Sequence, residues 1–246
     1  TETELYANIM LFFFAGHDTT GHTLTWLFYE LSRNPLIQHK LQFEVDEFFR
    51  VQYNRPIEYD DLQRLPYMKR CIAETLRLWP AIANGTFREL QQDDWITIGN
   101  DKNSSQTVWL PKGTYVQIPT VFQHRSKELW GDDAECFNPD RNFTEEEIWG
   151  DENISGRSME SERYSPFSFN RRNCIGKTFS HIEMRLMILY LLRDFHFVLS
   201  TLQTIHNSSD LSIIEFNKGT LGPKNQDNQI PVHKLLVNLI KRQSYL

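Results

Sequence analysis

The sequence predicts a mainly α-helical fold with small β-sheets, and three observations carry this prediction. Long segments with the apolar periodicity of helices end at or beside prolines. Another helical segment follows Cys174, where apolar residues recur at alternating spacings of 4 and 3. Only short runs have the composition of β-strands, and turn-forming residues separate them.

The first three predicted helices cover residues 5–34, 35–50 and 66–79. Pro35 ends the first helix and begins the second, because proline is tolerated only in the first turn of a helix. Pro66 begins the third helix in the same way, and Pro80 follows its end.

Short strands are predicted at residues 95–98, 108–110 and 115–118, and a tight turn, Pro111-Lys112-Gly113, joins the last two. Residues 122–164 are polar and irregular in pattern, with one short helix predicted near 145–149. The next helix runs from Cys174 to about Arg193, and its predicted apolar face is listed here: Ile175, Phe179, Ile182, Leu186 and Leu189. From Phe195 the chain alternates short strands and turns.

Composition excludes several classes of protein. The 246 residues are 40% hydrophobic, which excludes a wholly disordered chain, and the net charge of −6 gives no reason to expect a nucleic-acid partner. Three cysteines are too few for a disulfide framework, and no apolar run has transmembrane length. The chain begins inside a helical pattern, so we expect it to be the C-terminal portion of a larger protein, without a domain boundary within residues 1–246.

Cys174 lies in a basic, turn-prone loop before the last long helix, in the sequence FSFNRRNCIG of residues 167–176. Arginines and a helix N-terminus both stabilise negative charge, which suits a thiolate that binds a metal. Gly176 would let the backbone approach the sulfur closely, and Arg172 could reach a carboxylate on a bound ligand. Taken alone, the loop is equally compatible with a buried structural cysteine.

Three further motifs precede this loop. Ala15 and Gly16 would leave a hollow beside the first helix, and Asp18 next to Thr19 is suited to relaying protons into an apolar site. The alternative for this segment is a helix-packing glycine followed by ordinary polar residues. Glu74 and Arg77 share one helix face, although most such pairs are solvated. Arg141 lies between aromatic residues in FNPDRNF, residues 137–143, and the alternative there is a surface loop with a stacked arginine.

The order of these motifs resembles the C-terminal half of a cytochrome P-450, the family of haem-thiolate monooxygenases. The patterns are A-G-x-D-T-T, E-x-x-R, F-x-P-x-R-x-F and F-x-x-x-x-R-x-C-x-G, and the resemblance extends from Leu5 to about Val198. It implies the P-450 fold and an enzyme that inserts one oxygen atom from O2 into its substrate. One departure is Asn170, where the family usually has glycine. Asparagine tolerates a positive φ better than other non-glycine residues, so haem binding remains expected.

The resemblance also implies roles for individual residues. Cys174 would be the axial thiolate of a b-type haem, with Phe167 packed beside the sulfur and Gly176 next to it. Arg172 would pair with a haem propionate, and Arg88 is a second candidate for this role.

In the same way, Ala15 and Gly16 would line the oxygen-binding groove, where Asp18 and Thr19 would supply protons. Glu74, Arg77 and Arg141 would form the family's buried structural triad, which holds the third helix against the irregular segment. Lys177, together with Arg171 and Arg172, would form a basic patch that docks an acidic reductase, and the alternative is an ordinary solvated face.

The expected substrate is lipophilic, because residues 11–14 are apolar and aromatic. The sequence is also similar in style to eukaryotic fatty-acid and long-chain hydroxylases, which implies a fatty-acid-like substrate. Residues 81–86 and 217–221 also fall where family members contact substrate. Electrons would come from NADPH through a reductase. The protein would lie on the cytosolic face of the endoplasmic reticulum membrane, anchored by a segment outside this sequence. The alternative is a non-catalytic fragment that cannot hold haem alone.

Overall fold

The structure is a computed structural model that describes residues 1–52, 55–99, 106–144, 146–148, 161–169, 172–199, 212–216 and 235–242. Its helices are α1 (Glu2–Arg33), α2 (Pro35–Val51), the 3-10 helix η1 (Tyr59–Arg64), α3 (Pro66–Leu78), α4 (Thr120–His124), α5 (Lys127–Trp130) and α6 (Lys177–Asp194). Its strands are β1 (Thr86–Glu89), β2 (Asp94–Ile98), β3 (Gln106–Leu110), β4 (Tyr115–Ile118), β5 (Phe195–Leu199), β6 (Ser212–Phe216) and β7 (Leu235–Lys241). The predicted fold class, mainly α with small β-sheets, is confirmed.

The first three helices begin and end close to their predicted bounds. The Thr1 side chain accepts a hydrogen bond from the backbone N–H of Glu4, whose own side chain reaches back to Thr1, so a capping box begins α1. Pro35 and Pro66 are the first residues of α2 and α3. At these positions the missing proline N–H costs no helical hydrogen bond.

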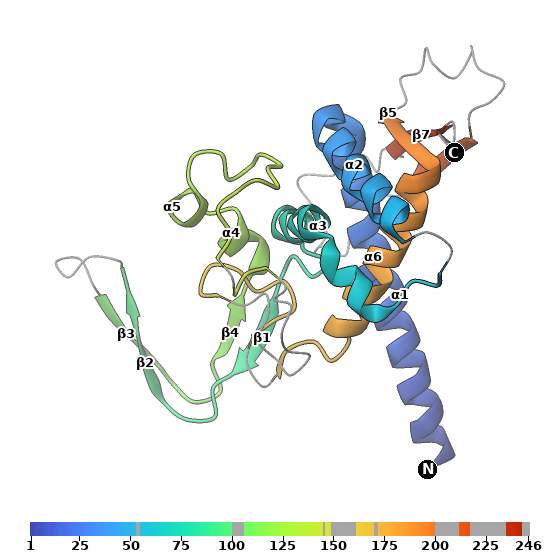
Figure 1. Cartoon of the computed structure of the whole chain (residues 1–246). Helices are drawn as coiled ribbons and strands as arrows, with labels where there is room; N and C mark the ends of the chain where they lie inside the picture. Colours follow the sequence, from blue (N-terminus) through green and yellow to red (C-terminus); the bar gives the residue numbers. More distant parts are fainter. Residues whose placement is uncertain are drawn as a thin grey trace.

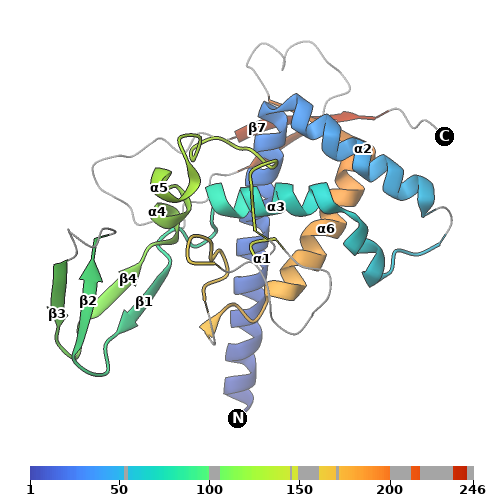
Figure 2. The same ribbon diagram turned by 60° about the vertical axis from the view of Figure 1, so that its left-hand side comes forward.

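The core lies where the C-terminal half of α1 meets α2, α3 and α6 (Figures 1 and 2). Its fully or nearly fully buried apolar side chains include Leu27, Leu31, Leu41, Val45, Met68, Ile72, Ile188 and Leu189. Aromatic pairs extend it: Phe28 stacks on Phe197 with ring centroids 4.2 Å apart, and Trp26 stacks on Trp79 at 3.7 Å. Burial of these helix faces is the main stabilising contribution to the fold.

The N-terminal half of α1 extends away from this core (Figure 1). Its large apolar side chains are exposed, and residues 11–14 are 57–69% accessible to solvent. Among the described residues, no helix combines the length and the apolar character needed to cross a membrane.

The strands of the small sheets do not all pair in the order in which they follow one another in the chain. β3 and β4 are joined by the predicted turn, in which Thr114 N donates to Pro111 O at 3.1 Å, yet they do not pair with each other. β3 pairs with β2, and β4 pairs with β1, which the sequence analysis missed. The turn therefore passes the chain from one two-stranded sheet to another.

Two other expectations were wrong in detail. Residues 122–130 belong largely to the short helices α4 and α5, whereas an irregular segment was expected. The described part of the predicted helix near 145–149 is a turn, in which Glu147 N and Ile148 N both donate to Thr144 O.

The helix α6 exposes part of its predicted apolar face. Ile175, which precedes the helix, and Phe179 are exposed, whereas Leu189 is fully buried. The buried side of α6 instead carries Lys177, His181, Met184, Arg185, Ile188, Leu189 and Leu192. Spacing of apolar residues alone could not reveal that polar residues occupy the first half of the buried face.

Two glutamines of α2 bind the outer edge of β5, which is an edge strand of the three-stranded sheet β5-β7-β6. Gln38 Nε2 donates to Phe197 O at 2.8 Å, and Phe197 N donates to Gln38 Oε1 at 2.7 Å. Gln42 Nε2 donates to Phe195 O at 3.0 Å. These bonds satisfy backbone groups that β7, on the other side of β5, does not reach.

Candidate functional site

Cys174 is an exposed, free thiol at the entrance of α6. Its backbone N–H donates to Phe167 O at 2.8 Å, which closes the cysteine loop, residues 167–176. A Cβ placed on Gly176 would lie 3.8 Å from Cys174 Sγ, so the glycine backbone is next to the sulfur, as expected. The loop therefore holds the sulfur at the surface of the described structure.

The cysteine loop contains a backbone feature that the sequence analysis missed. Ser168 has φ of 66°, in the left-handed region that residues other than glycine rarely adopt. It ends a turn in which Ser168 N donates to Ser165 O at 3.1 Å, with Pro166 as the second residue of the turn. Asn170, to which the positive φ was assigned, lies outside the described residues, as does Arg171.

Phe167 is half-buried and packs against the core. Its ring centroid is 5.2 Å from that of His181, and Lys177 Nζ lies 6.0 Å from the ring centre. Lys177 is buried, which corrects the proposed exposed basic patch: of its members, the described and exposed one is Arg172.

The motif of α1 lies in uninterrupted helix. Ala15 is exposed, and a Cβ added to Gly16 would meet nothing within 4 Å, so open space borders this part of the helix. Thr19 Oγ1 donates to Ala15 O at 2.7 Å, and the half-buried Asp18 is its neighbour. Figures 1 and 2 both place the start of α6, which follows Cys174, beside the middle of α1.

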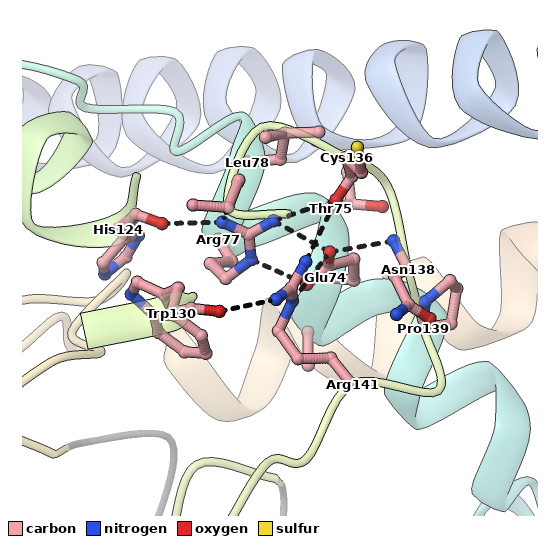
Figure 3. Close-up of polar contacts among 12 residues, drawn as sticks. Glu74, Thr75, Arg77, Leu78, His124, Trp130, Cys136, Asn138, Pro139 and Arg141 are labelled. Atoms are coloured by element: carbon pink, nitrogen blue, oxygen red, sulfur yellow. Dashed lines mark hydrogen bonds and ion pairs between the residues drawn. The ribbon is translucent and has the colours of Figure 1, made fainter. Parts of the chain in front are cut away.

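Glu74, Arg77 and Arg141 meet in the interior, as Figure 3 shows, and are called here the Glu-Arg-Arg network. The Glu74 carboxylate accepts from Arg77 Nε at 2.7 Å and from Arg77 Nη2 at 2.8 Å. Arg141 Nε lies 3.3 Å from Glu74 Oε1, which also accepts from Asn138 N at 2.9 Å. Two guanidinium groups and one backbone N–H thus surround a single carboxylate.

The remaining donors of both arginines bind the segment after α3. Arg77 Nη1 donates to His124 O and Ala134 O, both at 2.7 Å. Arg141 Nη1 donates to Trp130 O at 3.0 Å and to Asp133 Oδ1 at 2.7 Å, and this pairing lowers the pKa of Asp133. Such saturation of hydrogen bonds offsets the desolvation penalty of burying these charges.

A second buried carboxylate, Glu147, was not found from the sequence. It accepts hydrogen bonds from Arg163 Nε at 2.6 Å, Ser161 Oγ at 2.7 Å and Thr144 N at 2.9 Å. Burial acts to raise the pKa of Glu147, but the bonds from Arg163, Thr144 and Ser161 outweigh it and the pKa is lowered. Arg163 also lies over the Trp130 ring at 4.2 Å. Two residues separated by 16 positions give no local sequence signal of such a pair.

Arg88 lies on β1, opposite Val116 of β4, and its side chain is exposed. Its Nη1 donates to the carbonyl of neighbouring Phe87 at 3.0 Å. Residues 217–221, expected to contact substrate, lie outside the described residues.

The sequence profile of the cytochrome P450 family matches residues 1–224. The chain is 35% identical to cytochrome P450 3A12 of Canis lupus familiaris over 198 residues, which cover 80% of this chain and 35% of that protein. It is 35% identical to cytokinin hydroxylase of Arabidopsis thaliana over 193 residues, covering 77% and 32% of the two chains. With cytochrome P450 4F12 of Homo sapiens the identity is 33% over 198 residues, covering 80% and 34%.

The chain thus spans about a third of the length of these relatives. Its fold is similar to the crystal structure of the cytochrome P450 CYP102L1, with a TM-score of 0.66 and 23% identity, over 95% of this chain and 44% of that one. Since the family profile covers most of the sequence and relatives above 30% identity cover more than two thirds of it, the chain belongs to the cytochrome P450 family.

Proposed function

We propose that this chain is the C-terminal part of a single cytochrome P450 domain that acts as a haem-thiolate monooxygenase. The reaction would insert one oxygen atom from O2 into a lipophilic substrate. The observation that carries the proposal is the exposed, free Cys174, held by its backbone bond to Phe167 O at the entrance of α6. Membership of the family supports the same reaction class.

The residues present fit a haem bound through its iron to sulfur. A cysteine thiolate is an established axial ligand of haem, and no side chain at Gly176 obstructs Cys174 Sγ. A Cβ on Gly16 would meet nothing within 4 Å, and the start of α6, which follows Cys174, lies beside the middle of α1 (Figures 1 and 2). When bound, the haem supplies the redox chemistry that activates O2.

The cysteine loop and β1 supply the remaining haem-binding candidates. Phe167 would pack beside the sulfur, and the exposed guanidinium of Arg172 would pair with a propionate. Arg88 is the second propionate candidate. Glu74, Arg77 and Arg141 would act indirectly, because their bonds fix the segment between α3 and the cysteine loop.

Ala15, Gly16, Asp18 and Thr19 would form the oxygen side of the site. The Thr19 hydroxyl donates a hydrogen bond to Ala15 O, so the Thr19 oxygen remains able to accept another hydrogen bond. Rotation of this hydroxyl away from Ala15 would let Thr19 Oγ1 donate a hydrogen bond into the oxygen side of the site, and the Asp18 carboxyl would pass protons there from solvent. Exposed apolar side chains at residues 11–14 suit a lipophilic, fatty-acid-like substrate.

Electrons would come from NADPH through a reductase. The protein would lie on the cytosolic face of the endoplasmic reticulum membrane, anchored by a segment outside residues 1–246. The competing proposal is a partial product that cannot hold haem by itself. Its support is the span of about a third of the relatives' length.

The ligand assignment predicts a spectroscopic result. The whole protein, reduced under carbon monoxide, is expected to show the red-shifted Soret band of thiolate-ligated haem, and Cys174→Ala is expected to lose it. Cys136→Ala is the control, since Cys136 is also exposed and free but lies in another segment. A band that survives in Cys174→Ala would contradict the assignment. The isolated 246 residues are expected to bind haem weakly or not at all.

The proton-relay role predicts a separate effect. In Thr19→Ala, consumption of NADPH is expected to continue while the amount of product falls and peroxide accumulates. The reason is that the variant lacks the Thr19 hydroxyl, which would deliver protons to the oxygen side of the site. Thr25→Ala is a matched control, since Thr25 Oγ1 makes the same kind of bond to the carbonyl four residues earlier. Unchanged coupling of NADPH to product in Thr19→Ala would remove Thr19 from the relay.

A further inference from the structure

We propose that His124 is a positioning residue for Cys174, acting through the hydrogen bond that its ring accepts from the backbone N–H of Ser165. The proposal rests on the proposed function of Cys174 as the haem ligand. His124 is the last residue of α4, far from the cysteine in sequence, and its side chain is fully buried.

His124 accepts hydrogen bonds both at its backbone carbonyl and at its ring. Its carbonyl accepts from Arg77 Nη1 at 2.7 Å, which joins it to the Glu-Arg-Arg network (Figure 3). Its ring Nε2 accepts from Ser165 N at 2.9 Å. One residue therefore links the buried charges of α3 to the segment that leads into the cysteine loop.

The bond to Ser165 fixes the form of the ring. A backbone N–H can only donate, so Nε2 carries the lone pair and the neutral ring carries its proton on Nδ1. Burial lowers the pKa of His124 to about 3. The acceptor at Nε2 is therefore present at every pH at which the enzyme would work.

The segment at Tyr164 and Ser165, which donates this bond, is also bound to α3. The Tyr164 hydroxyl donates to Ala73 O of α3 at 2.9 Å, and the Tyr164 ring stacks on His124 with centroids 5.0 Å apart. The next residue, Ser165, accepts from Ser168 N. Within that turn, Phe167 O accepts from Cys174 N. A short series of backbone bonds thus connects the His124 ring to the cysteine.

The matched variants separate the acceptor from the shape of the ring. His124→Phe keeps a flat ring for stacking on Tyr164 but leaves the partly buried Ser165 N–H without an acceptor. His124→Gln replaces the ring but places an amide oxygen close to the position of Nε2. His124→Met has similar length to glutamine and lacks that oxygen.

The readout is the rate at which the whole, haem-loaded protein loses its thiolate-type Soret band in mild denaturant under carbon monoxide. His124→Phe is expected to lose the band up to about tenfold faster than wild type, since a partly buried N–H that loses its partner costs at most on the order of the energy of a tenfold change. His124→Gln is expected to restore most of the difference. Far-UV circular dichroism, recorded in parallel, is expected to change later than the band in His124→Phe.

Four outcomes decide between the explanations. Equal rates in wild type and His124→Phe would overturn the positioning role, and so would band loss that coincides with loss of helix. If His124→Phe does not fold, the rates of band loss are compared between His124→Gln and His124→Met. Equal rates in these two variants would likewise reject the positioning role. A wild-type protein without the thiolate band would instead refute the proposed function itself.

Discussion

Replacing Glu74 by alanine is expected to lower the free energy of unfolding by about 3–5 kcal/mol, the usual cost of removing one partner from a buried ion pair. Glu74 and Arg77 are fully buried, and Arg141 is 7% exposed. The substitution leaves two guanidinium groups in the interior without their shared carboxylate. We expect little folded, haem-containing protein, measured as soluble yield and as the midpoint of denaturant unfolding.

The exposed pair Lys40–Asp140 provides the control for this prediction. Its N–O distance of 2.7 Å equals that of Arg77–Glu74, but its side chains are 53% and 62% exposed. Solvent screening makes such pairs worth less than about 1 kcal/mol, so Asp140→Ala is expected to have a small effect. If both variants were equally stable, burial of the network would not be what makes Glu74 important.

Replacing Glu147 by alanine is expected to cost about 3 kcal/mol, because three donors, including the Arg163 guanidinium, lose their acceptor. This effect is smaller than at Glu74, since Arg163 is 26% exposed and can partly regain water. Glu47→Ala is the control, because Glu47 pairs with Arg50 at the surface. Unfolding in denaturant, monitored for both variants, measures the difference.

The Glu147 prediction also has a pH dependence with a defined sign. The folded pKa of Glu147 is lowered from its usual value of 4.5, so the ionised form contributes stability that is fully present above pH 4.5. That contribution falls as the pH decreases through the folded pKa. The stability difference between wild type and Glu147→Ala should therefore shrink on acidification, and a difference that grows would contradict the pairing with Arg163.

Helix positions were predictable because their signals are local. Pro35 and Pro66 determine where α2 and α3 begin, whatever those helices pack against. Motif order also predicted which residues the structure brings together in the Glu-Arg-Arg network, although residues 77 and 141 are far apart in sequence. That success came from resemblance to a family, since the same charges alone would have fitted a solvated helix face.

The features that could not be predicted depend on distant partners. The turn at Pro111 was recognised, but the pairing of β4 with β1 depends on where the chain before it lies. Lys177 is buried beneath the cysteine loop, against its apparent role in a basic patch, because a lysine stem can pack while its charge finds a partner. Ser168 adopts a positive φ, which could not be predicted from its being a serine.

The glutamines that bind β5 have a consequence for how the molecule meets other chains. An edge strand with free N–H and C=O groups can recruit a strand from another molecule and begin aggregation. Gln38 presents both an amide donor and an amide oxygen to Phe197, so its side chain imitates the peptide group of a neighbouring strand. With Gln42 on Phe195, α2 closes this edge of the sheet to intermolecular strand addition without adding a strand of its own.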